Sequence, residues 1–403
     1  MCLLIPFASY GAGRPLPESV ELRVLAKQEP GDLRVLVRAP LSVIRDASFP
    51  VRDDIGHIDL NAVGIILPSA ARYWIQRCLQ VSEGHDRVTD IEIVKARIAP
   101  LSDDSFRSFE QASSYFADTR DDKGANILWD QAWLDIDFKY STEGGGPLSI
   151  LPDVANLGAH VTTQLQYLGA DQAVHEFAFD GNPGLIYLTP RRLDIGKQFL
   201  AHGVGFISKS ADVVLFIFCL VLPFRRLREI RYIDLAFAAS LSVGFALPAF
   251  DLFPSGIWLS PLLATLSALV VLVAGLMNIG GIYPFRRAIL TAVAGLVFGA
   301  SAWFDFAARR QFAGPHSQIA PLAYWAGLLI ATQLGIVLLI PLLGGLFKAT
   351  DKRLELIVVS CLAADAALGW LEERWAQLRE VPWHFPVLDA RFFALLFAFM
   401  AVG

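Results

Sequence analysis

The stretch that decides the fold covers residues 203–279 and contains three apolar runs: GVGFISKSADVVLFIFCLVLPFRRLREI (203–230), RYIDLAFAASLSVGFALPAFDLFPSG (231–256) and IWLSPLLATLSALVVLVAGLMNI (257–279). A short basic turn follows the first run and a short polar turn follows the second. No charged side chain lies between Asp251 and Arg286. A helix needs about 20 largely apolar residues to cross a bilayer. The three runs therefore predict three transmembrane helices in an integral membrane protein.

The composition divides the 403 residues into two unlike parts. Residues 1–204 contain 27 acidic and 19 basic side chains, a net charge of −8, whereas the remainder contains 12 acidic and 15 basic side chains, a net charge of +3. The first part is long enough for a domain with its own core. Its acidity argues against nucleic acid as a partner, because nucleic acid attracts a basic surface.

Cysteine and histidine give no sign of a bound cofactor. The four cysteines lie far apart in the sequence, at Cys2, Cys78, Cys219 and Cys361. They form neither a disulfide framework nor a zinc-binding spacing. The histidines of residues 19–190 are scattered at no ligand spacing, at His57, His85, His160 and His175. That part has no nucleophile motif or phosphate-binding loop, so we expect no cofactor and no enzymatic activity.

Residues 1–18 have features of a remnant or truncated signal peptide. They combine a short apolar core with small residues near a cleavage region around Ala12. They lack a positively charged start, and the apolar run is shorter than the usual hydrophobic region of such peptides. An apolar but untargeted N-terminus is the alternative interpretation.

Residues 19–190 are predicted to form a mostly-β extracytoplasmic domain. The segments SVELRVLAK, DLRVLVRAP, TDIEIVKARIAP and AWLDIDFKYS alternate apolar and polar side chains, as half-buried strands do. Later segments such as AHVTTQLQYL and VHEFAFDG repeat the pattern. Two helical pieces are expected at about 68–80 and 105–117. Several short strands at such spacing favour an antiparallel sandwich.

Residues 191–204 are expected to form a linker helix at the outer membrane surface. Arg191 and Lys197 can lie among the headgroups while Leu200 and Val204 face the apolar interior. The transmembrane helical domain then covers residues 205–403. Its seven predicted helices lie at about 205–224, 232–251, 257–279, 288–307, 320–346, 354–373 and 390–403.

The basic residues of the connecting turns predict an orientation. Nine lie in the turns on one side of the bundle: Arg225, Arg226, Arg228, Arg231, Arg286, Arg287, Lys348, Lys352 and Arg353. Four lie in the opposite turns: Arg309, Arg310, Arg374 and Arg379. The side with nine should be cytoplasmic. We therefore expect a bacterial cytoplasmic membrane protein with the β-rich domain outside and the C-terminus inside.

Four segments in order resemble HupE/UreJ-like membrane proteins. They are GVGFISKSADVVLFIFCLVLPFRRLR, AFAASLS, IWLSPLLATLSALVVLVAGLMNI and SCLAADAALGWLEERWAQLREVPW. The β-rich first part also resembles the exported domain of the longer members. The resemblance implies a multi-pass bundle of hydrogenase or urease accessory type, a family in which some members are thought to pass nickel or cobalt. Such a role rests on histidines and carboxylates, which suit these cations.

This chain lacks most of the ligands that the resemblance implies. The family's polar positions are occupied by Phe206, Val213, Ala239, Ala264, Met277, Asp365 and Gly369. The positions that keep a polar family residue are Asp212, Ser240 and Asn278. One or two scattered oxygens do not make a transition-metal site. Fold and location are therefore expected to carry over, whereas metal binding is not.

The remaining polar residues predict an intramembrane pocket. Its candidates are Lys209, Asp212, Ser240 and Asp365, with Asn278, Glu373 and Arg374 as a second tier. Lys209 lies three residues before Asp212 on the same predicted helix, so one hypothesis is that the ammonium pairs with Asp212 and with Asp365. Alternatively, Lys209 reaches the headgroups and Asp365 is protonated. Glu373 and Arg374 could instead pair with each other at the helix end.

Three functions remain open. The preferred one is a non-enzymatic membrane protein that binds or assembles a protein partner on the extracytoplasmic side, with the lipid bilayer as its other partner. The second is a transporter for nickel, cobalt or another small solute. The third is an intramembrane metal-dependent hydrolase, which the absence of histidines from the seven predicted transmembrane helices disfavours.

Overall fold

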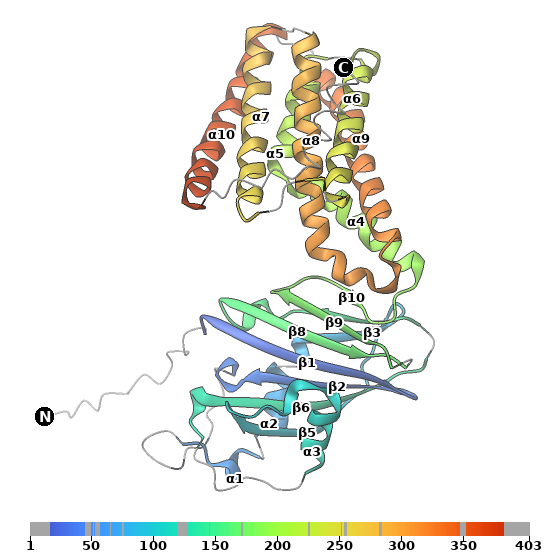
Figure 1. Cartoon of the computed structure of the whole chain (residues 1–403), viewed down its shortest axis with the longest axis vertical. Helices are drawn as coiled ribbons and strands as arrows, with labels where there is room; N and C mark the ends of the chain where they lie inside the picture. The colour runs from blue at the N-terminus through green and yellow to red at the C-terminus, as the bar shows by residue number, and fades with distance from the viewer. Residues whose placement is uncertain are drawn as a thin grey trace, which may run out of the picture. The chain divides into compact units, whose positions relative to one another are not determined.

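The computed structural model describes two separate units. It covers residues 17–44, 50, 52, 57–64, 66–74, 76–118, 127–144, 146–170, 172–224, 226–250, 252–253, 256–281, 284–346 and 352–382. The first unit is Met1–Arg191 and the second is Arg192–Gly403. The first carries β-sheets and the second consists of helices (Figure 1). This confirms the predicted order of a β-sheet domain followed by a helical region, while most of the expected signal peptide at 1–18 lies outside the described residues.

The strands of the first unit form two sheets. They are β1 (Ser19–Glu29), β2 (Asp32–Pro40), β3 (Leu79–Glu83), β4 (Asp86–Arg87), β5 (Ile91–Pro100), β6 (Ala132–Ser141), β7 (Leu148–Pro152), β8 (His160–Leu168), β9 (Val174–Asp180) and β10 (Ile186–Tyr187). The larger sheet has the order β5-β6-β2-β1-β8-β9, and the smaller has the order β10-β7-β3-β4. β1 and β8 run parallel, so the purely antiparallel arrangement that the sequence predicted is wrong. Alternation of side chains fixes the faces of a strand but not the direction of its neighbour.

The first unit also contains three α-helices. In the sequence, α1 (Leu60–Val63) and α2 (Leu67–Trp74) lie between β2 and β3, and α3 (Phe109–Ala117) lies between β5 and β6. The α3 helix begins where the Ser108 side chain accepts a hydrogen bond from the Gln111 amide, as N-cap serines do. Its buried residues Phe109, Ala112 and Phe116 recur at helical spacing. They pack in one cluster with apolar side chains of β1 and β2, so α3 covers part of one face of the larger sheet.

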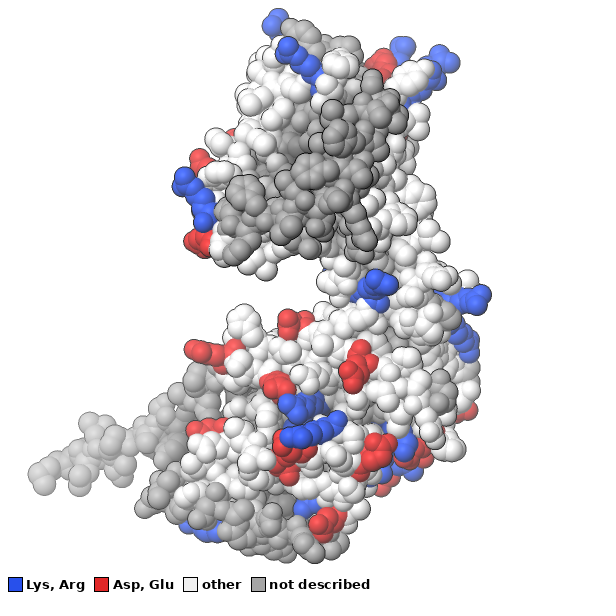
Figure 2. Space-filling model, in the orientation of Figure 1, with Lys and Arg blue, Asp and Glu red and all other residues white. Residues whose placement is uncertain are grey.

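The second unit contains seven helices among the described residues. They are α4 (Arg192–Lys209), α5 (Ala211–Val221), α6 (Leu227–Ala249), α7 (Leu259–Gly280), α8 (Pro284–Arg309), α9 (Ile319–Leu346) and α10 (Lys352–Glu380). On the face drawn in Figure 2, the charged side chains of this unit lie mostly toward its two ends, and most of the described surface between them is uncharged. Such a distribution is compatible with a membrane protein.

Four described helices are long and apolar enough to span a membrane: Arg228–Ala249, Leu259–Gly280, Phe285–Pro315 and Ile319–Gly345. A fifth span exists if α4 and α5, which are bent by 70° at their junction, are counted as one. The predicted helix at 354–373 lies within α10, which is not among these spans. The predicted helix at 390–403 lies outside the described residues. Seven transmembrane helices therefore stay a prediction.

The junction between α4 and α5 differs from the sequence expectation. A linker helix was expected over 191–204, with a span starting at residue 205, but α4 continues to Lys209 and the break lies at Ser210. Ser210 has an extended backbone, and its hydroxyl donates to the Phe206 carbonyl at 2.6 Å. A polar residue that bonds to the preceding turn commonly marks such a bend.

Close helix contacts in the second unit use glycine. α4 packs against α9, α6 against α8 and α7 against α10. A Cβ atom on Gly203 of α4 would lie 2.2 Å from the Tyr324 carbonyl oxygen of α9, and one on Gly299 of α8 would lie 2.3 Å from the Leu241 carbonyl oxygen of α6. Small residues allow helix backbones to approach in this way. Phenylalanine side chains fill the space where α5, α6 and α8 meet. For example, the ring centroids of Phe216 in α5 and Phe298 in α8 are 5.4 Å apart.

Candidate functional site

A pocket of about 190 Å³ opens within the helical unit at the break between α4 and α5. Five helices and the break residue contribute to it: its lining consists of Phe206, Ser210, Asp212, Val213, Ser260, Leu263, Ala264, Ser267, Phe298, Ser301, Phe304 and Arg374. The pocket therefore combines one carboxylate, one guanidinium and four hydroxyl groups with an apolar and aromatic wall.

An ion pair is the central polar feature of this pocket. Arg374 Nη1 lies 3.1 Å from Asp212 Oδ2, and the two side chains are 26% and 15% exposed. The same nitrogen donates to Ser267 Oγ and to the Ala264 carbonyl oxygen, both at 2.8 Å. Ser267 Oγ in turn donates to Asp212 Oδ2 at 2.5 Å. Helices α5, α7 and α10 are thus linked through one charged cluster.

The break at Ser210 sets the position of Asp212. Asp212 lies in the first turn of α5, where the positive end of the helix dipole stabilises a carboxylate. Its second oxygen, Oδ1, accepts from the Val213 amide at 3.2 Å. The carboxylate is therefore held by the start of its own helix on one side and by Arg374 and Ser267 on the other.

Two of the sequence-predicted site residues, Asp212 and Arg374, line the pocket. The apolar replacements Phe206, Val213 and Ala264 line it as well. The structure therefore brings together several of the positions at which the resemblance implies metal ligands. Ser267 was missed, although a hydroxyl within the apolar run of α7 is a sequence feature that could have indicated it.

Of the two hypotheses for Lys209, the pairing with Asp212 and Asp365 is wrong, whereas the outward-reaching side chain agrees with its exposure. No ion pair joins Lys209 to Asp212 or to Asp365 among the residues that the structure describes, and Lys209 is exposed. The expectation assumed one continuous helix, in which residues three apart share a face. Because Lys209 ends α4 and Asp212 belongs to α5, the 70° bend removes that relation.

The other predicted site residues do not line the pocket. Ser240 lies where α6 crosses α8, and its hydroxyl donates to the Phe237 carbonyl oxygen at 3.1 Å. Asp365 and Glu373 are exposed on α10. Asn278 is buried and donates to the Cys219 carbonyl oxygen at 2.9 Å.

Asn278 belongs to a second polar cluster, at the other end of α5. Arg287 Nη2 donates to Asn278 Oδ1 at 2.8 Å and to the Cys219 carbonyl oxygen at 3.1 Å. The sequence predicts Arg287 in a connecting turn of the bundle, but its side chain is only 4% exposed. A cation at the last carbonyls of a helix is stabilising. The α5 helix therefore has a carboxylate at its start and a guanidinium at its end. Each charge interacts favourably with the helix dipole at that end.

The donor set of the pocket does not suit a transition metal. Within the described ranges, no three His, Cys, Asp or Glu side chains form a group that could hold a metal ion. Asp212 is the one carboxylate among the described lining residues, and one of its oxygens is already bound by a guanidinium. Nickel and cobalt sites use several imidazole, thiolate or carboxylate ligands. The charge that a metal would supply is provided here by Arg374.

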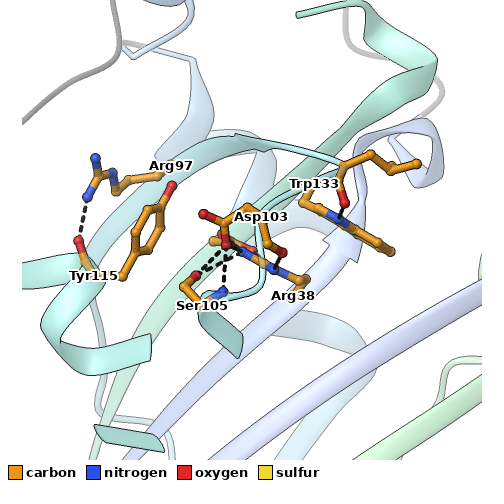
Figure 3. Close-up of polar contacts among 8 residues, drawn as sticks. Arg38, Arg97, Asp103, Ser105, Tyr115 and Trp133 are labelled. Carbon is orange, nitrogen blue, oxygen red and sulfur yellow. Dashed lines mark hydrogen bonds and ion pairs between the residues drawn. The ribbon is translucent and has the colours of Figure 1, made fainter. Parts of the chain in front are cut away.

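A buried ionic cluster also lies in the β-sheet unit (Figure 3). Arg38 of β2 makes a bidentate pair with Asp135 of β6 at 2.7 Å, and these side chains are 2% and 0% exposed. Arg38 also binds Asp103 at 2.7 Å. Burial raises the pKa of Asp135 to about 6. For Asp103, hydrogen bonds from Ser105 and Arg38 outweigh desolvation and lower the pKa.

The same region contains cations at the end of α3. Arg97 donates to the Tyr115 carbonyl oxygen at 2.6 Å, and Lys95 donates to the Phe116 carbonyl oxygen at 2.9 Å. Arg97 also lies over the Tyr115 ring, 4.4 Å from its centroid (Figure 3). Cations at a helix C-terminus satisfy its last carbonyls. The charged groups here fasten α3 and the segment before it to the sheet, so we assign them a structural role.

No family model matches the chain, and no curated protein matches it.

Proposed function

We infer that the chain is a multi-pass protein of the bacterial cytoplasmic membrane, of HupE/UreJ type, with the β-rich unit outside and the C-terminus inside. The apolar helices of the second unit support insertion, and the excess of basic residues in one set of turns supports the orientation. The assignment to the HupE/UreJ type is supported by the four segments that resemble this family and follow one another in the same order. Seven transmembrane helices are part of this proposal.

The arrangement of the two sheets as a sandwich also belongs to the proposal. The Tyr140 hydroxyl of β6, in the larger sheet, lies 3.4 Å from the Leu79 carbonyl oxygen of β3, in the smaller sheet. Tyr140 is fully buried. A contact of this kind is what two sheets packed face to face would produce.

The proposed role is non-enzymatic, and the pocket of the bundle does not hold a metal ion. The observation that carries this proposal is the Asp212–Arg374 pair, completed by Ser267. A divalent cation would have to displace the guanidinium and would then find a single carboxylate. We therefore place the activity in binding or assembling a protein partner through the β-rich unit, with the bundle as its anchor in the lipid bilayer.

Titration with nickel tests this proposal. The full chain is purified in detergent without a histidine tag, and nickel or cobalt chloride is added in a calorimeter. We expect no saturable heat at micromolar metal. Saturable binding that Asp212→Asn abolishes would contradict the proposal. Asp365→Asn, which changes an exposed carboxylate of α10, is the matched control and should behave as the wild type in either case.

A permease for a small solute is a second candidate function. The observation that favours it is the pocket itself, because a polar space of about 190 Å³ beside a broken helix is not needed by a passive anchor. Transporters of several folds place their sites at such broken helices.

A further inference from the structure

The hydrogen-bond donors of the pocket are only partly used. Arg374 makes all three of its hydrogen bonds through Nη1. Its Nε and Nη2 make none within the described part of the chain. The side chain is 26% exposed, and it lines the pocket. A guanidinium presents its donors as a planar fork that matches a carboxylate. Arg374 therefore balances Asp212 with one nitrogen and keeps donors available for a second anion.

The hydrogen-bond acceptors of the pocket are also incompletely used. Among the residues that the structure describes, Asp212 Oδ1 accepts only from the adjacent Val213 amide, at 3.2 Å. The hydroxyls of Ser210 and Ser301 donate to the carbonyl oxygens of Phe206 and Val297, four residues earlier in each case, at 2.6 and 2.9 Å. A hydroxyl that donates in this way retains two acceptor lone pairs. The pocket therefore offers acceptors to a group with several N–H donors.

The broken helix adds a fixed polarity. The α5 helix starts at the pocket with an extended Ser210 whose hydroxyl does not cap it. The start of a helix carries a partial positive charge, and in discontinuous membrane helices it commonly faces an anionic substrate group. The Asp212 carboxylate, in the first turn of α5, already neutralises part of this charge. The positive end of α5 and the guanidinium of Arg374 together favour a ligand that has a negative group.

Aromatic side chains complete the lining. Phe206, Phe298 and Phe304 come from α4 and α8 and border the same space. Aromatic faces attract ammonium groups as well as apolar chains. A volume of about 190 Å³ lies below the roughly 300–1,000 Å³ that is usual for pockets of drug-sized ligands. The ligand must therefore be small.

We propose that this pocket binds a small zwitterion of the α-amino-acid class. The carboxylate is bound by Nε and Nη2 of Arg374, and the ammonium by Asp212 Oδ1 with the hydroxyls of Ser210 and Ser301. A zwitterion keeps the net charge of the pocket at zero, which neither a free anion nor a metal cation would do. This inference rests on the proposed function, because it requires a pocket without metal.

Binding of a matched set of compounds tests the inference. The full chain in lipid nanodiscs is titrated with L-leucine, with 4-methylpentanoate, which lacks the ammonium, and with 3-methylbutylamine, which lacks the carboxylate. We expect saturable binding of L-leucine and about tenfold or more weaker binding of both analogues, because a buried polar group left without its partner is costly. Glycine, L-alanine and L-serine are tested in the same way. If none of the four amino acids binds, or if an analogue binds as tightly, the inference is overturned.

Variants connect the binding to the pocket. Arg374→Gln should weaken amino-acid binding at least tenfold, whereas Arg379→Gln, the same change on the exposed part of α10, should leave it unchanged. Ala264→Leu adds apolar volume to the lining without removing a charge and should abolish binding. It provides the test if Arg374→Gln fails to fold. Unchanged affinity in a folded Ala264→Leu or Arg374→Gln protein would place the ligand elsewhere.

The same sample separates this inference from the proposed function. Nickel is titrated alongside the amino acids. Nickel binding in the pocket would contradict the proposed function and the inference together. If neither nickel nor any amino acid binds, the inference fails and the metal-free role stands.

Discussion

Arg374 determines the charge balance of the helical pocket. It neutralises Asp212 from a helix 162 residues further along the chain, and it links that carboxylate to Ser267. Removing one partner of such a pair leaves the other charge uncompensated in a partly desolvated site. The pair is therefore a site at which single substitutions and the corresponding double substitution should have different effects.

We predict that Arg374→Gln destabilises the folded chain by about 1–3 kcal/mol, less than for a fully buried pair because water reaches both side chains. Asp212→Asn should cost a similar amount. The double substitution should cost less than the sum of the two, because no charge is then left alone. Thermal unfolding of the four proteins in one detergent measures this cycle. Additive losses would show that the two side chains do not interact.

The raised pKa of Asp135 predicts how the stability of the folded state changes with pH. Its pKa is raised to about 6 by burial, above the value of about 3.9 for an unfolded chain. Between about pH 4 and pH 6 the folded state therefore binds more protons than the unfolded state. The free energy of unfolding should fall as the pH rises through this window. Asp135→Asn removes the titrating carboxyl group and with it this part of the pH dependence.

Hydrogen exchange of β6 (Ala132–Ser141) measures the effect locally. After correction for the intrinsic pH dependence of exchange, the wild type should lose protection relative to Asp135→Asn as the pH rises from about 4 to about 6. Asp104→Asn, an exposed position beside the cluster, serves as the control and should follow the wild type. Parallel profiles for the wild type and Asp135→Asn would contradict the raised pKa.

At the scale of the elements, the helices of the second unit pack closely at glycine residues. We predict that Gly299→Ala destabilises the bundle by about 1–3 kcal/mol, because the new Cβ would lie 2.3 Å from a backbone oxygen of α6. Gly335→Ala is the matched control, since its Cβ would meet only the Ile217 side chain at 4.0 Å. That change should be neutral or slightly stabilising. Thermal unfolding of both variants in detergent checks the difference, and equal stabilities would contradict the crossing.

Features that depend on local composition could be predicted from the sequence. The apolar length of 257–279 is a property of that segment alone and predicted α7 closely. The alternation in SVELRVLAK likewise predicted β1. The parallel pairing of β1 with β8 could not be predicted, because it joins segments far apart in the chain. Polar pairs such as Arg38 with Asp135 were missed for the same reason.

The candidate site was predicted in part. Asp212 was among the candidates because the resemblance marks it as a polar position that this chain keeps, and a carboxylate in an apolar run implies a partner. One hypothesis gave Lys209 as that partner, and it is wrong because one bend at Ser210 is enough to change which residues share a face. Arg374 was placed in the second tier because it lies at the end of a predicted span. Its long side chain reaches the pocket from there.

At the scale of the whole molecule, the two parts of the chain differ in composition. The first 204 residues have a net charge of −8, whereas the remainder is apolar and has a net charge of +3. The basic residues of the helical part favour one set of turns. The account therefore depends on where the cell places the first unit, more than on any single side chain.

Protease protection measures that location. Cells that produce the full chain are converted to spheroplasts, or broken into inverted membrane vesicles, and both are treated with proteinase K before immunoblotting for residues 17–191. We predict that the first unit is digested in spheroplasts and protected in inverted vesicles, and that the intact chain stays in the membrane fraction after a carbonate wash. Protection in spheroplasts with digestion in inverted vesicles, or recovery of the chain in the soluble fraction, would contradict the account.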